Sequence, residues 1–346
     1  MHVRESNDAV RVQLYAMAPT TCTTNTILVH GATRCYQPVN ASFARRRQRR
    51  QDHGDGESRG KSKSAVVGYQ LDESTKLALQ EQVAARERDG RGVSRFWRDQ
   101  YSAMHETAKN WDQFYTRHRT HFFKDRHYME DEYPDLENAR VGGERRTLLE
   151  AGCGVGNTVL PLLDSLPSVH FFATDFSPKA IQLLNATQVG PTAKERLHAF
   201  VSDMSSENAM EVWQRHILSS EPDGVDIVMM IFSLSAVPPE RHAQAMDNIS
   251  KVMKVGGRLL FRDYARCDHT QLKFSTNNRL EENFYVRQDG TLTYFFDQGA
   301  LVELFEMHGF KAIESKHIER VIENRSTKET MRRIWIQATF EYVGPQ

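Results

Sequence analysis

From residue 147 onward, short apolar runs alternate with segments in which apolar residues recur every three or four positions. The first kind of pattern predicts buried strands and the second kind predicts helices that bury one face. We expect helices between the early strands, and strands over 147–150, 169–174, 197–202, 224–232, 256–263, roughly 313–323 and 331–342. This alternation predicts a doubly wound α/β fold with a mostly parallel sheet of seven strands.

The chain before residue 147 has a different pattern. Residues 1–68 are rich in Thr, Ser, Arg and Gly without periodicity, which predicts a disordered basic tail. Leu71–Arg88 predicts a charged surface helix, and the segment from Ser94 to about His118 predicts a longer helix with one aromatic face. Trp111 and Tyr115 end this face, and their spacing alone favours packing on a domain over contact with a ligand.

A glycine-rich turn follows the strand at 147–150. Glycines 152, 154 and 156 allow a tight turn and a close approach of backbone to a ligand, and the helix that begins near Asn157 offers free N–H groups. The dinucleotide fingerprint Gly-x-Gly-x-x-Gly needs glycine at position 157. Glu150 also suits a cationic amino-acid group better than a pyrophosphate. A dinucleotide-dependent oxidoreductase is therefore disfavoured.

Each of the next strand ends carries a residue suited to a nucleoside. Asp175, 21 residues after Gly154, can accept the two hydroxyls of a ribose. Asp203 and Met204 end the third strand, where an adenine would lie, and the apolar end of the fourth strand near Ile231 would cover its other face. Taken singly, each is equally a cap or a core residue, but the ordered set predicts a nucleoside site.

Composition and charge narrow the class of protein. The 346 residues suggest about two domains, and the formal net charge is zero. Residues 1–64 hold 11 Lys and Arg against 5 Asp and Glu, while the rest hold 34 against 40. A nucleic-acid partner would therefore need a local basic face. Four cysteines without a CxxC pair indicate neither a zinc site nor a disulfide framework, so we expect no metal.

Two segments bear on partners and compartment. Tyr115–Tyr128 interleaves basic and aromatic side chains, a mixture that suits unpaired RNA but also occurs in ordinary surface loops. No apolar run approaches the ~18 residues that cross a bilayer, so we expect no membrane association. Residues 9–51 lack acidic side chains, so a mitochondrial transit peptide is an alternative to a cytoplasmic location.

Several motifs carry a resemblance to known proteins. Gly256-Gly257 leads into a buried strand, as is common in class I S-adenosylmethionine-dependent methyltransferases, which residues 147–342 resemble. More specific are the motifs at 122–127, 149–157, 175–178, 231–237, 261–264 and, above all, 282–291. From about Lys109 to the C-terminus the chain closely resembles the methyltransferase-like family that makes 3-methylcytidine in the tRNA anticodon loop. Residues 333–337 look most like its threonyl/arginyl-tRNA branch.

The resemblance implies a division of the chain and a cofactor. Residues 1–68, which composition assigns to a basic tail, are not covered by it. It implies that the helical and basic–aromatic extension at 69–146 covers the cofactor and contacts RNA, and that residues 147–346 form a Rossmann-like methyltransferase domain. It also implies S-adenosylmethionine as cofactor. The residues expected to contact this cofactor are Trp111, Tyr115, Gly152, Asp175, Asp203, Met204 and Ile231.

The resemblance also implies an RNA-facing side and a reaction. The residues expected to contact RNA are Phe123, Lys124, Arg126, His127, Arg262 and Arg287. The reaction expected is attack of cytosine N3 on the sulfonium methyl, at position 32 of the anticodon loop. Asp263 and Asp125 are the candidate catalytic carboxylates, because positive charge grows on the base during transfer.

Partners and alternatives complete the expectations. The tRNA anticodon stem-loop is the expected substrate, and an aminoacyl-tRNA synthetase or an anticodon-binding-domain protein is the expected type of protein partner. The alternatives are methylation of a protein or small molecule on the same fold, and a non-catalytic RNA-binding subunit. The intact glycine turn speaks against the last of these.

Overall fold

The computed structural model describes residues 66–68, 73–88, 106–141, 144–324 and 329–345. The tail expected at 1–68 lies outside these residues except for its last three, which form a strand. None of the helices in the described residues is both long enough and apolar enough to span a membrane.

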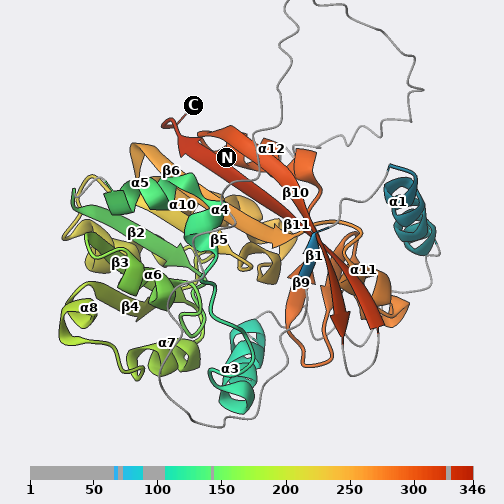
Figure 1. The fold of residues 1–346 in the computed structure, drawn as a ribbon, viewed down its shortest axis with the longest axis horizontal. Coiled ribbons are helices and arrows are strands. Elements are labelled where there is room, and N and C mark those ends of the chain that lie inside the picture. Colours follow the sequence, from blue (N-terminus) through green and yellow to red (C-terminus); the bar gives the residue numbers. More distant parts are fainter. Residues whose placement is uncertain (1–65, 69–72, 89–105, 142–143, 325–328, 346) are drawn as a thin grey trace, which may run out of the picture. The chain divides into compact units, whose positions relative to one another are not determined.

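One mixed sheet organises the described chain, and its strand order is β1-β10-β11-β6-β5-β2-β3-β4 (Figure 1). The five strands from β6 to β4 are parallel, β11 runs antiparallel to β6, and β10 runs antiparallel to β11. The strands are β1 (Val66–Gly68), β2 (Arg146–Ala151), β3 (Val169–Asp175), β4 (Leu197–Val201), β5 (Val225–Ile231), β6 (Met253–Tyr264), β10 (Phe310–Asn324) and β11 (Glu329–Tyr342). All seven expected strands are present. The eighth, β1, is too short for a sequence pattern to reveal.

Helices cover both faces of this sheet because successive strand residues point to opposite sides. Leu148 and Phe171 belong to one apolar cluster, while their neighbours Leu149 and Phe172 belong to the other. The first cluster packs under α4 (Met129–Glu132), α5 (Pro134–Val141), α6 (Val159–Ser165) and α7 (Pro178–Asn185). The second packs under α1 (Glu73–Arg88), α9 (Ala209–Trp213), α10 (His242–Lys251) and α12 (Gln298–Glu306).

The remaining elements are short or lie at the edges. They are α3 (Glu106–His118), α8 (Pro191–Glu195), α11 (His269–Lys273), and a small sheet of β7 (Arg279–Glu281), β8 (Phe284–Val286) and β9 (Leu292–Tyr294). Asp289-Gly290 is a sequence typical of a tight turn, and these residues form the turn between β8 and β9, where Gly290 has a φ of 80°. Phe284 and Phe295 beside it are fully buried, so these aromatics form a small core.

The structure tests two sequence patterns before residue 147 only in part. The helix expected from Ser94 to about His118 is present as α3 from Glu106 to His118, and the earlier part of that expectation, with Trp97, Tyr101 and Met104, lies outside the described residues. The sequence pattern at 140–144 predicts a linker, but α5 continues to Val141. Leu136 and Ala139 of α5 are buried against the sheet, and this packing stabilises the helix. The polar composition of the segment gives no sign of a helix in the sequence.

A buried ion pair fixes α4 on the sheet. The Arg262 guanidinium from β6 lies 3.0 Å from the carboxylate of Glu132, whose other oxygen is 3.2 Å from Arg320. Gln337 donates to the backbone carbonyl of Glu132 at 2.9 Å, and the Tyr128 ring lies 5.1 Å from the Arg262 guanidinium. Arg262 is only 2 % exposed, so its place in this network replaces the RNA contact that the resemblance implied.

The network gives a stability prediction. Glu132→Ala leaves the buried Arg262 without its carboxylate, and we expect a loss of about 3 kcal/mol or more in the free energy of unfolding. The exposed pair of Glu211 and Arg215 is the matched control, because removing it with Glu211→Ala should cost no more than about 0.5 kcal/mol. Urea denaturation measures both. Equal losses in the two variants would contradict the assigned role of Glu132.

Candidate functional site

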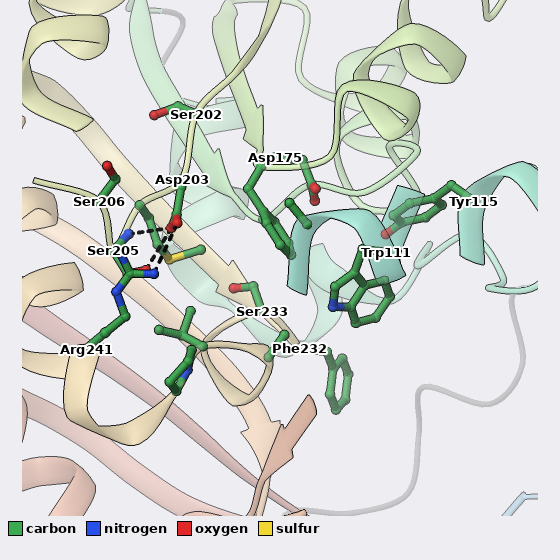
Figure 2. Close-up of a pocket in the computed structure, with 17 residues that line it drawn as sticks. Trp111, Tyr115, Asp175, Ser202, Asp203, Ser205, Ser206, Phe232, Ser233 and Arg241 are labelled. Carbon is green, nitrogen blue, oxygen red and sulfur yellow. Dashed lines mark hydrogen bonds and ion pairs between the residues drawn. The ribbon is translucent and has the colours of Figure 1, made fainter. Parts of the chain in front are cut away.

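A cavity of about 520 Å³ opens where β2, β3, β4 and β5 end (Figure 2). Because β3 lies on one side of β2 and β5 on the other, the chain changes direction there, which is where α/β sheets bind ligands. The volume suits a nucleoside-sized ligand. The lining comes from α3, the strand ends and the loop after β5: Ala108, Trp111, Tyr115, Gly152, Asp175, Phe176, Ser202, Asp203, Met204, Ser205, Ser206, Phe232, Ser233, Ala236, Val237, Pro238 and Arg241.

The glycine turn is packed so closely that side chains do not fit. A Cβ on Gly152, whose φ is 79°, would lie 2.4 Å from Ser233 Cβ. A Cβ on Gly154, whose φ is 55°, would lie 2.7 Å from the Tyr115 hydroxyl oxygen. Both positions therefore need glycine for space and for backbone conformation. The turn brings bare backbone to the cavity wall, between the end of β5 and helix α3.

Asp175 holds this turn in place. One of its carboxylate oxygens accepts a hydrogen bond from the Gly154 N–H at 2.9 Å, and the other accepts one from the Ser177 N–H at 2.9 Å. Burial raises the pKa of Asp175 to about 6. The side chain is 5 % exposed and still lines the cavity, so lone pairs of both oxygens remain for a ligand.

Helix α3 forms a second wall and is tied to the domain by Asp112. That carboxylate accepts hydrogen bonds from the Ser177 hydroxyl and, at 3.1 Å, from the Lys179 N–H at the start of α7. The rings of Trp111 and Tyr115 on α3 lie 5.7 Å apart, and Figure 2 shows both at one end of the cavity. Burial raises the pKa of Tyr115 well above its usual value, so its phenol stays neutral.

The opposite end of the cavity carries Asp203 and Arg241 (Figure 2). One Asp203 oxygen accepts hydrogen bonds from the Ser205 N–H at 2.9 Å and from its hydroxyl at 2.7 Å. The other oxygen lies 3.6 Å from the Arg241 guanidinium. This pair presents a carboxylate and a cation to one ligand edge, which suits the amine and ring nitrogens of an adenine.

Several buried polar atoms around the cavity have no hydrogen-bond partner among the described residues. The Ser202 and Ser233 hydroxyls and the Trp111 indole N–H are inaccessible to solvent and have no hydrogen-bond partner among the described residues. Unsatisfied buried groups cost free energy, and a polar ligand removes that cost.

Glu150 at the end of β2 is the strongest case of this kind. It is fully buried behind the residues that line the cavity. Neither carboxylate oxygen has a well-formed hydrogen bond among the described residues, although the Thr158 hydroxyl and the Val159 N–H lie close enough to lower its pKa. Burial raises its pKa to about 7, against the lowering effect of the positive charge of Arg126. A buried carboxylate beside a glycine turn attracts a cationic group. With Asp175 and Asp203 for the nucleoside, these residues fit S-adenosylmethionine, which joins an adenosine to an amino-acid end.

Six of the seven residues expected to contact the cofactor line this one cavity: Trp111, Tyr115, Gly152, Asp175, Asp203 and Met204. Ile231 does not, because its side chain is 2 % exposed and packs in the apolar cluster under α6. The next two residues, Phe232 and Ser233, line the cavity in its place. The continuous apolar run gives no sign of where the strand stops. In the structure β5 ends at Ile231, and the backbone turns at Phe232, which has a φ of 56°.

The two candidate catalytic carboxylates do not line the cavity. Asp263 is fully buried, and its oxygens accept hydrogen bonds from the Ser235 N–H at 2.9 Å and the Tyr264 N–H at 2.8 Å. Burial raises its pKa to about 6. Asp125 is exposed and accepts a hydrogen bond from the Asn157 amide at 3.0 Å. Both hold backbone or loop segments in this structure.

The residues expected to contact RNA divide into three groups. Lys124 and His127 are exposed, and Phe123 packs beside Tyr115 and Val155. Arg126 lies with its guanidinium 5.6 Å from the centre of the Phe232 ring, and Arg287 lies 5.8 Å from that of Tyr264. Arg262 alone is buried in the α4 network.

Sequence reasoning missed the aromatic surface that joins these arginines. The Phe232 ring lies 5.2 Å from that of Tyr264 and 5.7 Å from that of Trp335. The Arg333 guanidinium is 5.6 Å from both of the latter rings. We call Phe232, Tyr264 and Trp335 the aromatic ledge. Phe232 follows β5, Tyr264 ends β6, and Trp335 lies opposite Tyr264 in the middle of β11. These positions are far apart in sequence, so no local pattern could identify the ledge. Within the described residues, no cluster of metal-binding side chains occurs.

Comparisons with known proteins agree with this geometry. A family described as a methyltransferase domain matches residues 149–259. The human tRNA N(3)-cytidine methyltransferase METTL6 is 38 % identical over 266 residues, which cover 77 % of this chain and 90 % of that protein.

Two fungal relatives are similarly close. The Schizosaccharomyces pombe tRNA N(3)-methylcytidine methyltransferase trm141 is 36 % identical over 252 residues, covering 72 % of this chain and 97 % of that protein. The tRNA(Thr) (cytosine(32)-N(3))-methyltransferase of Saccharomyces cerevisiae is 40 % identical over 238 residues, covering 68 % of this chain and 37 % of that longer protein.

The glycine turn gives a binding prediction. Gly152→Ala should weaken the binding of S-adenosylhomocysteine about tenfold or more, because the new Cβ meets Ser233 and the backbone is strained at positive φ. Gly190→Ala is the control, since a Cβ there meets no atom within 4 Å. Isothermal titration calorimetry measures both. Unchanged affinity in Gly152→Ala would place the ligand elsewhere.

Glu150 gives a pH prediction. Its pKa is raised by folding, so its contribution to stability is full below its ordinary value of 4.5 and is lost as the pH rises through about 7. Glu150→Gln should therefore be more stable than the parent at pH 8, and this advantage should shrink at pH 5.5. The same substitution should weaken S-adenosylhomocysteine binding. Denaturation at the two pH values tests the first claim, and an equal difference at both would contradict it.

Proposed function

This chain belongs to the tRNA N(3)-cytidine methyltransferase family, and from that premise we propose that it methylates N3 of cytidine 32 in the tRNA anticodon loop. The observation that carries the proposal is the nucleoside cavity, with its buried carboxylates, lying directly beside the aromatic ledge and its arginines. The cavity accounts for the cofactor, and the ledge is suited to an unstacked base.

The reaction needs little general acid–base catalysis from the protein. S-adenosylmethionine, when bound, supplies an electrophilic methyl group on a cationic sulfur. Cytosine N3 is uncharged at neutral pH and has a lone pair, so it needs no deprotonation before it attacks. The protein contributes chiefly by holding the base at the correct distance and angle.

We assign that holding role to the aromatic ledge. N3 lies on the pairing edge of cytosine, so the base must leave its stack before it reacts. Phe232 belongs to both the cavity wall and the ledge, so a base stacked on the ledge lies next to the cavity. Such stacking contributes about 1–3 kcal/mol per base. The guanidiniums of Arg126 and Arg287 lie near the same rings and would bind RNA phosphates. Arg333 lies near these rings as well, but its guanidinium is paired with the buried carboxylate of Asp268 at 2.9 Å.

Asp263 serves this arrangement as a positioning residue. Its carboxylate fixes the backbone of Tyr264 on the ledge and of Ser235 after the cavity wall. A buried carboxylate that is ionised above about pH 6 also gives this region a negative potential, which favours the positive charge of the methylated base. Asp125 belongs with the loop that faces RNA.

The extension at 69–146 would then act as cofactor cover and RNA contact, through α3 and the loop at 122–128. We propose a threonine tRNA as the first substrate to test, because the relative from Saccharomyces cerevisiae carries that tRNA in its name. An aminoacyl-tRNA synthetase or an anticodon-binding-domain protein is the proposed partner. The cytoplasm is the proposed compartment, with the mitochondrion as the alternative given the acid-poor segment at 9–51.

A methyl-transfer assay tests the function. The purified chain is incubated with labelled S-adenosylmethionine and unmodified tRNA transcripts, and nucleosides are identified by mass spectrometry. We expect label in 3-methylcytidine. The label should disappear when cytidine 32 of the transcript is replaced by uridine, and it should be strongly reduced in the protein variant Asp175→Ala. A parallel reaction with cell extract supplies any protein partner that the purified chain needs. Label in another nucleoside, or in protein with none in RNA even with extract, would refute the proposal.

A further inference from the structure

Asn157 is the position at which the glycine turn departs from the dinucleotide fingerprint, and neither the cavity nor the ledge includes it. Its side chain is 7 % exposed. It closes the turn just before α6 begins, so cofactor binding and the position of Asn157 depend on the same piece of backbone.

Hydrogen bonds join Asn157 to the loop that faces RNA. Its side-chain amide donates to the Asp125 carboxylate at 3.0 Å and to the Phe123 carbonyl at 3.3 Å. Its own backbone carbonyl accepts from the Arg126 N–H at 2.8 Å. Three consecutive bonds of this kind align residues 123–126 along the end of the glycine turn.

Neighbouring contacts strengthen the same junction. The Arg126 guanidinium donates to the Thr158 hydroxyl at 2.6 Å while it lies over the Phe232 ring. Phe123 packs against the small apolar cluster that contains Val155 from the glycine turn and Tyr115 from α3. The loop at 123–126 is thus attached to the cofactor side at Asn157 and reaches the ledge through Arg126.

We propose that Asn157 couples cofactor binding to RNA binding in this enzyme. A cofactor that orders the glycine turn also orders residues 123–126 through Asn157. RNA then binds a loop that is already ordered, so RNA binding loses less conformational entropy. By linkage, RNA must strengthen cofactor binding by the same factor. Asn157 is a positioning residue here, and the inference rests on the proposed function.

The hydrogen-bond chemistry suggests an isosteric test. Asn157→Asp keeps the size of the side chain but replaces its N–H donor with a carboxylate that repels Asp125. Adding Asp125→Asn restores one bond with donor and acceptor exchanged, although the bond to the Phe123 carbonyl stays lost. Asn185→Asp is the matched control, because Asn185 is exposed at the end of α7, away from this junction.

The measurement is the dissociation constant of fluorescent unmodified tRNA transcripts, with and without saturating S-adenosylhomocysteine. We expect the full chain to bind RNA about fivefold or more tightly with S-adenosylhomocysteine, within the usual range of coupling between sites. The ratio of the RNA dissociation constants without and with S-adenosylhomocysteine should stay the same in Asn185→Asp and fall to about one in Asn157→Asp. It should recover in part in the double variant. Thermal melting confirms that each variant is folded.

Other outcomes separate the two proposals. If RNA and S-adenosylhomocysteine both bind but independently in the unchanged chain, the coupling is refuted and the proposed function stands. If Asn157→Asp keeps the full factor, or the double variant recovers none of it, Asn157 does not carry the coupling through this bond. If no tRNA binds even with cell extract present, the proposed function and the coupling both fail.

Discussion

The carboxylate of Asp175 is the constraint on which the site depends. It holds the glycine turn through the Gly154 N–H and the start of α7 through the Ser177 N–H. The Ser177 hydroxyl in turn donates to Asp112 on α3. The turn, the helix and the aromatic cover therefore share one set of hydrogen bonds. A single acidic residue at a strand end thus holds two walls of the cavity together, in addition to offering oxygens to a ribose.

Buried charge serves different purposes in different parts of the molecule. The Arg262 guanidinium pairs with Glu132 and docks α4 on the sheet. The Glu150 carboxylate has no well-formed hydrogen bond within the described residues, and burial raises its pKa to about 7, so its charged form costs stability unless a cation lies nearby. Proteins commonly retain such costly groups where they bind ligands or catalyse reactions. The contrast distinguishes a structural charge from one that serves binding.

The same arrangement explains how a fold shared by many enzymes is directed to one kind of substrate. The parallel sheet and glycine turn provide a nucleoside cavity, which by itself does not select an acceptor. The aromatic ledge and its surrounding arginines supply features that suit an unpaired base on a phosphate backbone. The loop at 123–126 contacts the end of the glycine turn through Asn157 and the aromatic ledge through Arg126.

The sequence by itself determined the seven strands, the glycine turn, and six of the seven expected cofactor residues in the cavity, because strand periodicity and strand-end residues are local patterns. It misplaced Ile231, because the residue at which a strand ends depends on distant contacts. It misplaced Arg262 for the same reason, because its buried partner Glu132 is distant in sequence. Only the tertiary structure brought Phe232, Tyr264 and Trp335 together. They lie in or next to β5, β6 and β11, which are neighbours only through strand pairing, and hydrogen bonding between distant segments leaves no periodic trace in the chain.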